Sequence, residues 1–133
     1  MSSGSLDTNV LLRLLLNDIP EQHQSVKRLL ADTSGNFSVA DTAIIELVFA
    51  LQKHYGFTRQ QVAEAVIGLT QLSVVNCNRT LFENVMPVFL EHTALSFENC
   101  CLSTYAILND AEPLWTFDKK LANQAASAEL VGA

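Results

Sequence analysis

The feature that most limits the possible folds of this chain is a regular alternation of amphipathic segments with short apolar runs. Seven segments have the helical spacing of apolar residues, at 10–16, 21–33, 42–54, 58–72, 79–92, 97–109 and 118–127. Between them lie four or five very short runs typical of strands: the residues ending at Leu6, 37–39, 73–75, 113–117 and 130–131. This order favours an α/β fold of three layers, with a short, mostly parallel sheet of four or five strands flanked by about seven helices.

Individual residues indicate how some of these helices begin and pack. Ser38 and Asp41 have the spacing of a capping box that would open helix 42–54, and Thr58 is expected to cap the helix that follows. Pro87 predicts a kink or a break in helix 79–92. Helix 42–54 is apolar nearly all round, and Glu46 is the one acid in its apolar part. We therefore expect a central, buried helix there.

The length of the chain favours one domain. With 133 residues it matches the size of an ordinary domain, so we predict a single domain over 1–133, in which residues 1–5 resemble a remnant of cloning. Hydrophobic residues make up 49% and charged residues 17%, which excludes a disordered chain. No apolar run approaches the roughly 20 residues that cross a bilayer, so no membrane partner is expected.

Charge and cysteine content limit the partners and the compartment. The net charge of -6 argues against a broad electrostatic grip on nucleic acid, so any such contact is expected to be local. Cys77, Cys100 and Cys101 are an odd number and two are adjacent, which fits reduced thiols rather than disulfides or a zinc site. The first residues also lack the apolar stretch of a signal peptide. These features together predict a cytoplasmic protein.

Three acids stand at positions that favour a site. Asp7 and Asp118 each directly follow an apolar strand signal, and ligands of parallel sheets gather at the carboxyl ends of strands. Glu46 lies within an apolar helix, where an acid must be paired, protonated or bound to metal. Clustered carboxylates bind Mg²⁺ or Mn²⁺, which activate water and stabilise phosphoryl displacement. Structural roles remain open, because both aspartates could cap helices and Glu46 could pair with a buried Lys or Arg.

Three short motifs in this order resemble those of one family. Residues 6–13 (LDTNVLLR) resemble the opening of PIN domains, 44–47 (IIEL) their second acidic motif, and 114–121 (LWTFDKKL) their closing motif. The resemblance spans essentially the whole chain and is greatest to the VapC-like ribonuclease toxins of bacterial toxin–antitoxin pairs. It implies a Mg²⁺ or Mn²⁺ centre, endonucleolytic cleavage of RNA by a metal-activated water, a homodimer, and inhibition by a cognate antitoxin protein.

The resemblance also assigns roles to individual positions. Asp7, Glu46 and Asp118 match the acidic residues that bind the metal and carry catalysis in the family. Asn9 and Thr116 match its supporting polar residues.

Three basic residues near these motifs are candidates for contacts with RNA phosphates, namely Arg13, Lys119 and Lys120. Each of them could equally be a solvated charge near the end of a helix.

The chain departs from the family pattern at the fourth acid. PIN domains usually have an aspartate near the start of the helix that here spans 97–109, and Asn99 stands at that position. An amide oxygen can bind a metal, but it carries no charge and cannot act as a base. Two charges about 4 Å apart interact by roughly 4 kcal/mol at an effective dielectric of about 20, so the loss of one carboxylate weakens metal binding.

Three explanations of Asn99 remain open. Asn99 could be a natural neutral ligand that takes part in metal binding and catalysis, the chain could be a natural inactive module, or Asn99 could be an engineered change from aspartate. The leading hypothesis is accordingly a metal-dependent ribonuclease. The alternative is a catalytically inactive PIN-fold module that binds RNA or an antitoxin partner. A phosphoacceptor receiver domain is a weaker alternative, because the adjacent acids of its first strand are missing here.

Overall fold

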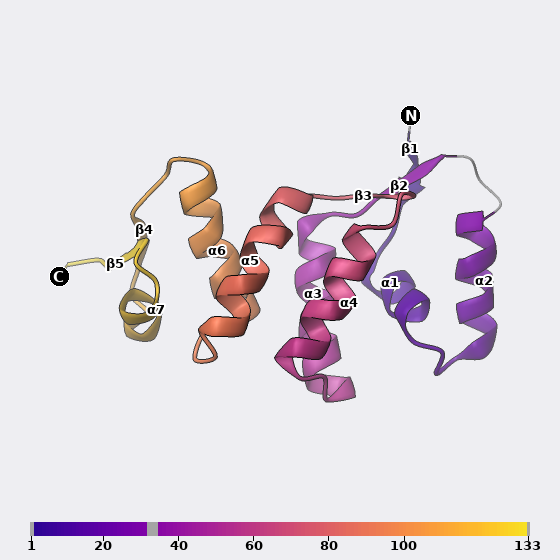
Figure 1. Ribbon diagram of the computed structural model, residues 1–133, viewed down its shortest axis with the longest axis horizontal. Coiled ribbons are helices and arrows are strands. Elements are labelled where there is room, and N and C mark those ends of the chain that lie inside the picture. Colours follow the sequence, from indigo (N-terminus) through magenta and orange to yellow (C-terminus); the bar gives the residue numbers. More distant parts are fainter. Residues whose placement is uncertain (1, 32–34, 133) are drawn as a thin grey trace. The chain divides into compact units, whose positions relative to one another are not determined.

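The computed structural model describes residues 2–31 and 35–132 of the chain (Figure 1). The described residues form seven helices and five strands, in the order β1-α1-α2-β2-α3-α4-β3-α5-α6-β4-α7-β5. They divide into two compact units, Met1–Asn78 and Arg79–Ala133, which we describe separately.

The first unit contains a parallel three-stranded sheet. Its strands, in spatial order, are β1 (Ser2–Ser5), β2 (Asn36–Ser38) and β3 (Val75–Asn76). Ser5 pairs with Ser38, and Phe37 pairs with Val75. Phe37 on the central strand and Val75 on β3 are buried, so this part of the short sheet belongs to the core of the unit.

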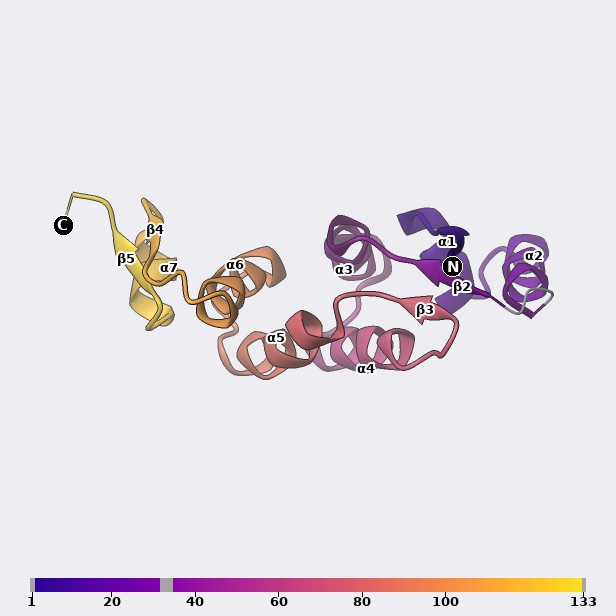
Figure 2. The ribbon, with the colours of Figure 1, turned by 90° about the horizontal axis from the view of Figure 1, so that it is seen from above.

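Four helices complete the first unit: α1 (Thr8–Leu15), α2 (Pro20–Ala31), α3 (Asp41–Tyr55) and α4 (Arg59–Thr70). Helix α1 packs against α2 and α3, and α3 also packs against α4, as the view from above shows (Figure 2). Ile44, Leu47, Val48 and Leu51 of α3 are at most 1% exposed. Their spacing of three or four residues places them on one face, which forms the core of the unit.

Helices α3 and α4 begin differently: the predicted cap of α4 is confirmed, and that of α3 is wrong. Thr58 caps α4 in a capping box with Gln61, as expected. The capping box predicted from Ser38 and Asp41 is wrong: Ser38 belongs to β2, and the residue before α3 is Ala40, whose side chain has no hydrogen-bonding group. Asp41 lies instead in the first turn, where its charge favours the helix N-terminus.

Helix α3 is not buried all round, contrary to expectation. Glu46 is exposed, and the side chain of Phe49 is 59% exposed. The apolar residues of this helix exceed what its one inward face holds, so some of them remain on its outer face within the described structure.

The second unit consists of α5 (Arg79–Glu91), α6 (Phe97–Leu108), β4 (Leu114–Thr116), α7 (Lys119–Gln124) and β5 (Ala128–Leu130). Strands β4 and β5 pair in parallel, and α5 packs against α6. Phe97 of α6 stacks on Phe82 with ring centroids 6.2 Å apart and meets Phe89 edge-on at 5.2 Å. Helix α5 continues through Pro87, so a break is wrong, whereas the kink that was predicted as its alternative stays a prediction.

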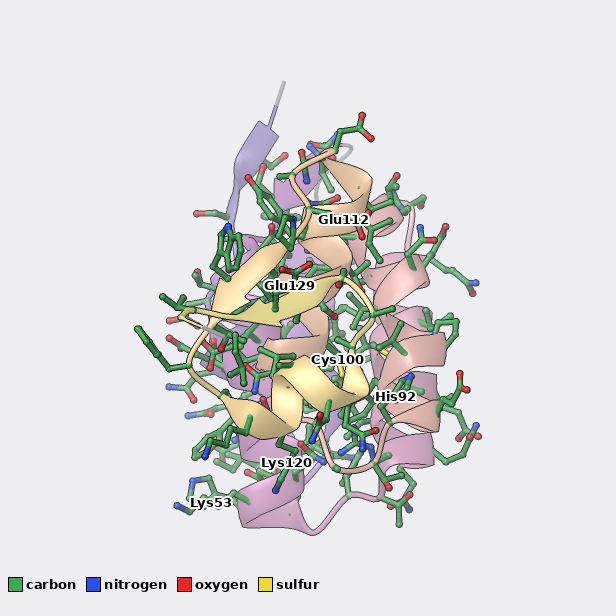
Figure 3. The ribbon with its side chains drawn as sticks, turned by 90° about the vertical axis from the view of Figure 1, so that its left-hand side faces the viewer. Lys53, His92, Cys100, Glu112, Lys120 and Glu129 are labelled. Carbon is green, nitrogen blue, oxygen red and sulfur yellow. The ribbon has the colours of Figure 1, made fainter. Side chains whose placement is uncertain are left out.

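Two of the three cysteines are buried. Cys100, labelled in Figure 3, and Cys101 are buried on α6, and Cys77 is half-buried.

The structure confirms the α/β class, the parallel pairing of strands and the seven helices among the described residues. The strands form one sheet of three and one of two, each within its own unit. Ser2–Ser5 form β1, so residues that resembled a cloning remnant contribute a strand. The single domain over 1–133 stays a prediction. Within 2–31 and 35–132, no helix has the length and apolar content of a membrane span.

Candidate metal centre

Asp7 stands where β1 passes into α1. The preceding residue, Leu6, is only 5% exposed, and its N–H donates to the carbonyl oxygen of Ser38 at 3.0 Å. Asp7 itself is exposed and is the N-cap of α1, where its Oδ1 accepts the N–H of Val10 at 3.0 Å. The buried strand end and the cap therefore fix both the position and the orientation of this carboxylate.

Glu46 reaches the same region from α3. Its Oε2 lies 3.2 Å from Oγ1 of Thr8, and the same hydroxyl lies 3.2 Å from the carbonyl oxygen of Ala43. Thr8 is thus a donor that connects the first turn of α1 with α3. The sequence predicted a buried acid with a metal, a proton or a cationic partner; burial is wrong, because Glu46 is exposed and a neutral hydroxyl holds it.

The two carboxylates line one hollow, which we call the acidic groove. It has a volume of about 440 Å³ and lies between the start of α1 and the first half of α3. Asp7, Thr8, Asn9 and Glu46 supply its polar side chains, together with Ser5 and Thr42. The structure therefore brings together three of the residues singled out in the sequence, Asp7, Asn9 and Glu46.

The acidic groove has the donor chemistry that a hard divalent ion requires. Carboxylate oxygens each accept more than one bond, so the cap bond of Asp7 and the Thr8 bond of Glu46 leave capacity for a metal. Within the described residues, no group of three or more His, Cys, Asp and Glu side chains is gathered closely enough to hold an ion. Mg²⁺ is commonly held by one or two carboxylates with water and substrate phosphate, so two carboxylates fit this chemistry.

Asp118 has the same local role in the second unit that Asp7 has in the first. It follows β4 and caps α7, and its Oδ1 accepts the N–H of Leu121 at 3.0 Å. Oγ1 of Thr116 accepts the N–H of Asp118 at 2.9 Å. Asp7 and Asp118 therefore both cap helices, which was the structural role considered from the sequence. Capping does not conflict with metal binding, because one carboxylate can accept a hydrogen bond and also bind a metal.

Three further predicted residues also belong to the second unit. Asn99 is half-buried in the first turn of α6, where its backbone N–H donates to Oγ of Ser96 at 3.1 Å. Lys119 and Lys120 are exposed in the first turn of α7, and Figure 3 labels Lys120 on this helix. The roles of Asn99, Asp118 and both lysines at a metal or RNA site stay predictions.

Arg13 is engaged in a polar network at the far end of α1. Its Nη1 lies 2.6 Å from Oδ1 of Asp18, its Nη2 donates to the Tyr55 hydroxyl at 3.1 Å, and this hydroxyl donates to Oδ2 of Asp18 at 3.1 Å. The hydrogen bond to Tyr55 contributes most to raising the pKa of Arg13, and the pairing with Asp18 raises it further. Partial burial lowers this pKa but does not outweigh the two contacts. Partial burial raises the pKa of Asp18, but the bonds from Tyr55 and Arg13 outweigh it and lower that pKa.

Thr8 is the site residue that sequence reasoning missed. Its neighbours Asp7 and Asn9 matched a motif, whereas its partner Glu46 is 38 positions away on α3. The signal in the sequence that could have identified Thr8 was its position, with a hydroxyl side chain, between two predicted site residues.

Comparison with known families identifies the chain. The PIN domain family matches residues 5–127, a span that contains every candidate site residue named above. The chain therefore belongs to the PIN domain family. PIN domains are generally metal-dependent nucleases that use divalent ions such as Mg²⁺ or Mn²⁺. A search among curated proteins gave no match.

Proposed function

We propose that this PIN domain is a metal-dependent endoribonuclease of the VapC-like toxin type, which cleaves RNA phosphodiesters. The observation that carries the proposal is the acidic groove, in which Asp7 and Glu46 line one hollow although 38 residues separate them in sequence. Family membership supports nuclease chemistry, and the three motifs of the sequence support the toxin type.

The residues of the first unit prepare this groove for a cation. The bond from Val10 holds the Asp7 carboxylate, and the Thr8 hydroxyl holds that of Glu46, so little reorganisation accompanies binding. A divalent ion bound there would supply Lewis acidity, which activates water and stabilises the charge of the phosphoryl group under attack. Asn9 adds an amide to the rim of the groove, where it is placed to hydrogen-bond substrate or water.

Asp118 and Asn99 are proposed as the further ligands, with Thr116 supporting Asp118. Asn99 contributes a neutral oxygen, so this metal set carries one negative charge fewer than a set with aspartate. A weaker metal affinity than in a four-acid site follows from that difference. Arg13, Lys119 and Lys120 are proposed contacts to RNA phosphates, although Arg13 would have to act from within its network with Asp18.

The toxin assignment also includes partners and a location. We propose a cytoplasmic homodimer that a cognate antitoxin protein inhibits. Sedimentation velocity of the purified chain tests the dimer, and a single monomeric species over the micromolar range would contradict it.

Cleavage of labelled single-stranded RNA tests the proposed chemistry. The chain is expected to cut RNA in Mg²⁺ or Mn²⁺ and to lose this activity in EDTA or after Glu46→Gln. Glu64→Gln is the matched control, because Glu64 is an exposed acid of the same unit that does not line the acidic groove. Equal loss of activity in Glu46→Gln and Glu64→Gln would contradict a special role for the groove.

Asn99 favours a second candidate function, a catalytically inactive PIN-fold module that binds RNA or an antitoxin partner. The specific observation behind it is the neutral Asn99, which stands where PIN domains usually have a charged aspartate. This alternative predicts binding without turnover in the wild-type chain and also in Asn99→Asp. The ribonuclease proposal predicts instead that Asn99→Asp cuts RNA at least as fast as the wild type.

A further inference from the structure

A second hollow adjoins the acidic groove along α1 and α3. We call it the aromatic groove; its volume is about 540 Å³, and Phe49, His54, Tyr55 and Arg13 line the part that the acidic groove does not share. Thr8, Asn9 and Glu46 line both hollows. The two grooves therefore adjoin, so a flexible ligand held by the acids could reach from the acidic groove into the aromatic groove.

Phe49 gives the aromatic groove an open aromatic surface. Its side chain is 59% exposed, so the ring is accessible to a ligand. Phe49 follows Glu46 by three positions on α3, so the two side chains are neighbours on the same helical face, about one turn apart. An aromatic ring thus stands beside a proposed metal-binding carboxylate.

The side chains of Lys53 and His54 lie against this ring. Nζ of Lys53 lies 5.2 Å from the centre of the Phe49 ring, and the His54 ring meets it edge-on at 6.5 Å. Figure 3 labels Lys53 near the end of α3. An exposed aromatic face with an adjacent positive charge is the combination that binds single-stranded nucleic acid, because a base stacks on the ring and a phosphate lies by the charge.

The far end of the aromatic groove is fixed. The network of Arg13, Asp18 and Tyr55 joins α1, the loop after it and the end of α3. The positive charge of Arg13 is largely compensated there by Asp18, whereas Lys53 places its charge directly over the Phe49 ring.

From this geometry we infer that the aromatic groove is a nucleotide subsite, in which Phe49 stacks a base of single-stranded RNA next to the phosphate at the acidic groove. The inference rests on the proposed ribonuclease function and adds a specificity-determining residue to it. Size and charge favour RNA over a protein partner: one aromatic side chain with the charge of Lys53 above it matches a nucleotide, whereas a stable protein interface needs about 1,000 Å² or more. It also agrees with the acidic net charge, which requires nucleic-acid contacts to be local.

Fluorescence anisotropy with a short labelled single-stranded RNA tests the subsite. The chain is measured in EDTA, where the proposed chemistry does not proceed. Phe49→Ala is expected to weaken RNA binding by about 5- to 150-fold, the range that corresponds to loss of one base stack. Phe49→Leu is expected to behave like Phe49→Ala, because it keeps an apolar side chain without a stacking face, and Phe49→Tyr to bind like the wild type. Tyr105→Ala, which removes a 56% exposed aromatic residue of the second unit, is the matched control and should bind normally.

The outcomes separate this inference from the proposed function. If Phe49→Ala binds RNA as the wild type does while metal-dependent cleavage persists, the subsite is wrong and the ribonuclease stands. If the wild type neither binds nor cuts RNA, both are wrong. If Phe49→Ala and Phe49→Leu change the sedimentation of the chain and leave RNA affinity unchanged, the ring belongs to a protein interface, which also overturns the subsite.

Discussion

Asp7 has two roles in this account, as the cap of α1 and as a metal ligand, and substitutions can separate them. Asp7→Ala removes both, whereas Asp7→Asn keeps an acceptor for the N–H of Val10 and removes the charge. Without metal, loss of the cap costs about 0.5–2 kcal/mol, which corresponds to roughly 2–8 °C in unfolding temperature for a chain of this size. Asp7→Asn is expected to unfold close to the wild-type temperature.

The effect of metal is expected to be the same for both substitutions. Mn²⁺ at about a hundred times its dissociation constant stabilises the folded wild type by about 2.7 kcal/mol. Two unit charges about 4 Å apart interact by roughly 4 kcal/mol at an effective dielectric of about 20, so removing one charge beside a divalent ion weakens binding by at least about a thousandfold. That loss reduces the stabilisation by Mn²⁺ to below about 0.1 kcal/mol.

Thermal unfolding with and without Mn²⁺ provides the assay for the Asp7 variants. The wild type and the control Glu64→Gln should show the full Mn²⁺ shift, and Asp7→Ala and Asp7→Asn should show almost none. Only Asp7→Ala should be destabilised in EDTA. A full Mn²⁺ shift in Asp7→Asn would refute the role of Asp7 as a charged ligand, and normal stability of Asp7→Ala would refute its role as a cap.

Other predictions follow from single contacts. Thr8→Val removes the hydroxyl that holds Glu46 and should lower kcat for RNA cleavage about tenfold with KM less affected; an unchanged kcat would show that Glu46 needs no positioning. Phe97→Ala should lower the free energy of unfolding by about 3–5 kcal/mol in denaturant titrations, and a loss under about 1 kcal/mol would contradict its central place in the second unit. The pKa of Asp18 is lowered in the folded chain. The stabilisation of the folded state by the Asp18 charge is therefore present above the ordinary pKa of 3.8 and is lost as the pH falls through the lower pKa of the folded chain. Asp18→Asn should therefore be destabilised at neutral pH, with the difference narrowing below about pH 4 in thermal unfolding; a pH-independent difference would contradict this sign.

The parts of the fold that follow from local patterns were predictable. The apolar spacing of the chain gave the helices within a few residues, and the Thr58 cap needed only neighbouring residues. The placement of Asp7 at a strand end followed from the buried run before it. Its meeting with Glu46 in one groove also agrees with the motifs of the sequence.

The remaining features depend on contacts between distant residues. Nothing near Glu46 in sequence indicates that Thr8 is its partner, and the exposure of Phe49 depends on which face of α3 packs inward. The pairing of Arg13 with Asp18 and Tyr55 likewise joins two helices through side chains that single-sequence patterns do not connect. Sequence periodicity identifies apolar residues but not which of them the core has room for.

The measurement that tests the central claim most directly is Mn²⁺-dependent cleavage of end-labelled RNA by the wild type and by Asn99→Asp, with Asp7→Ala as the blank. We expect that Asn99→Asp cuts, that the wild type cuts more slowly or at higher Mn²⁺, and that Asp7→Ala does not cut. Folded wild-type and Asn99→Asp proteins that leave every RNA intact would contradict the ribonuclease and favour the binding module.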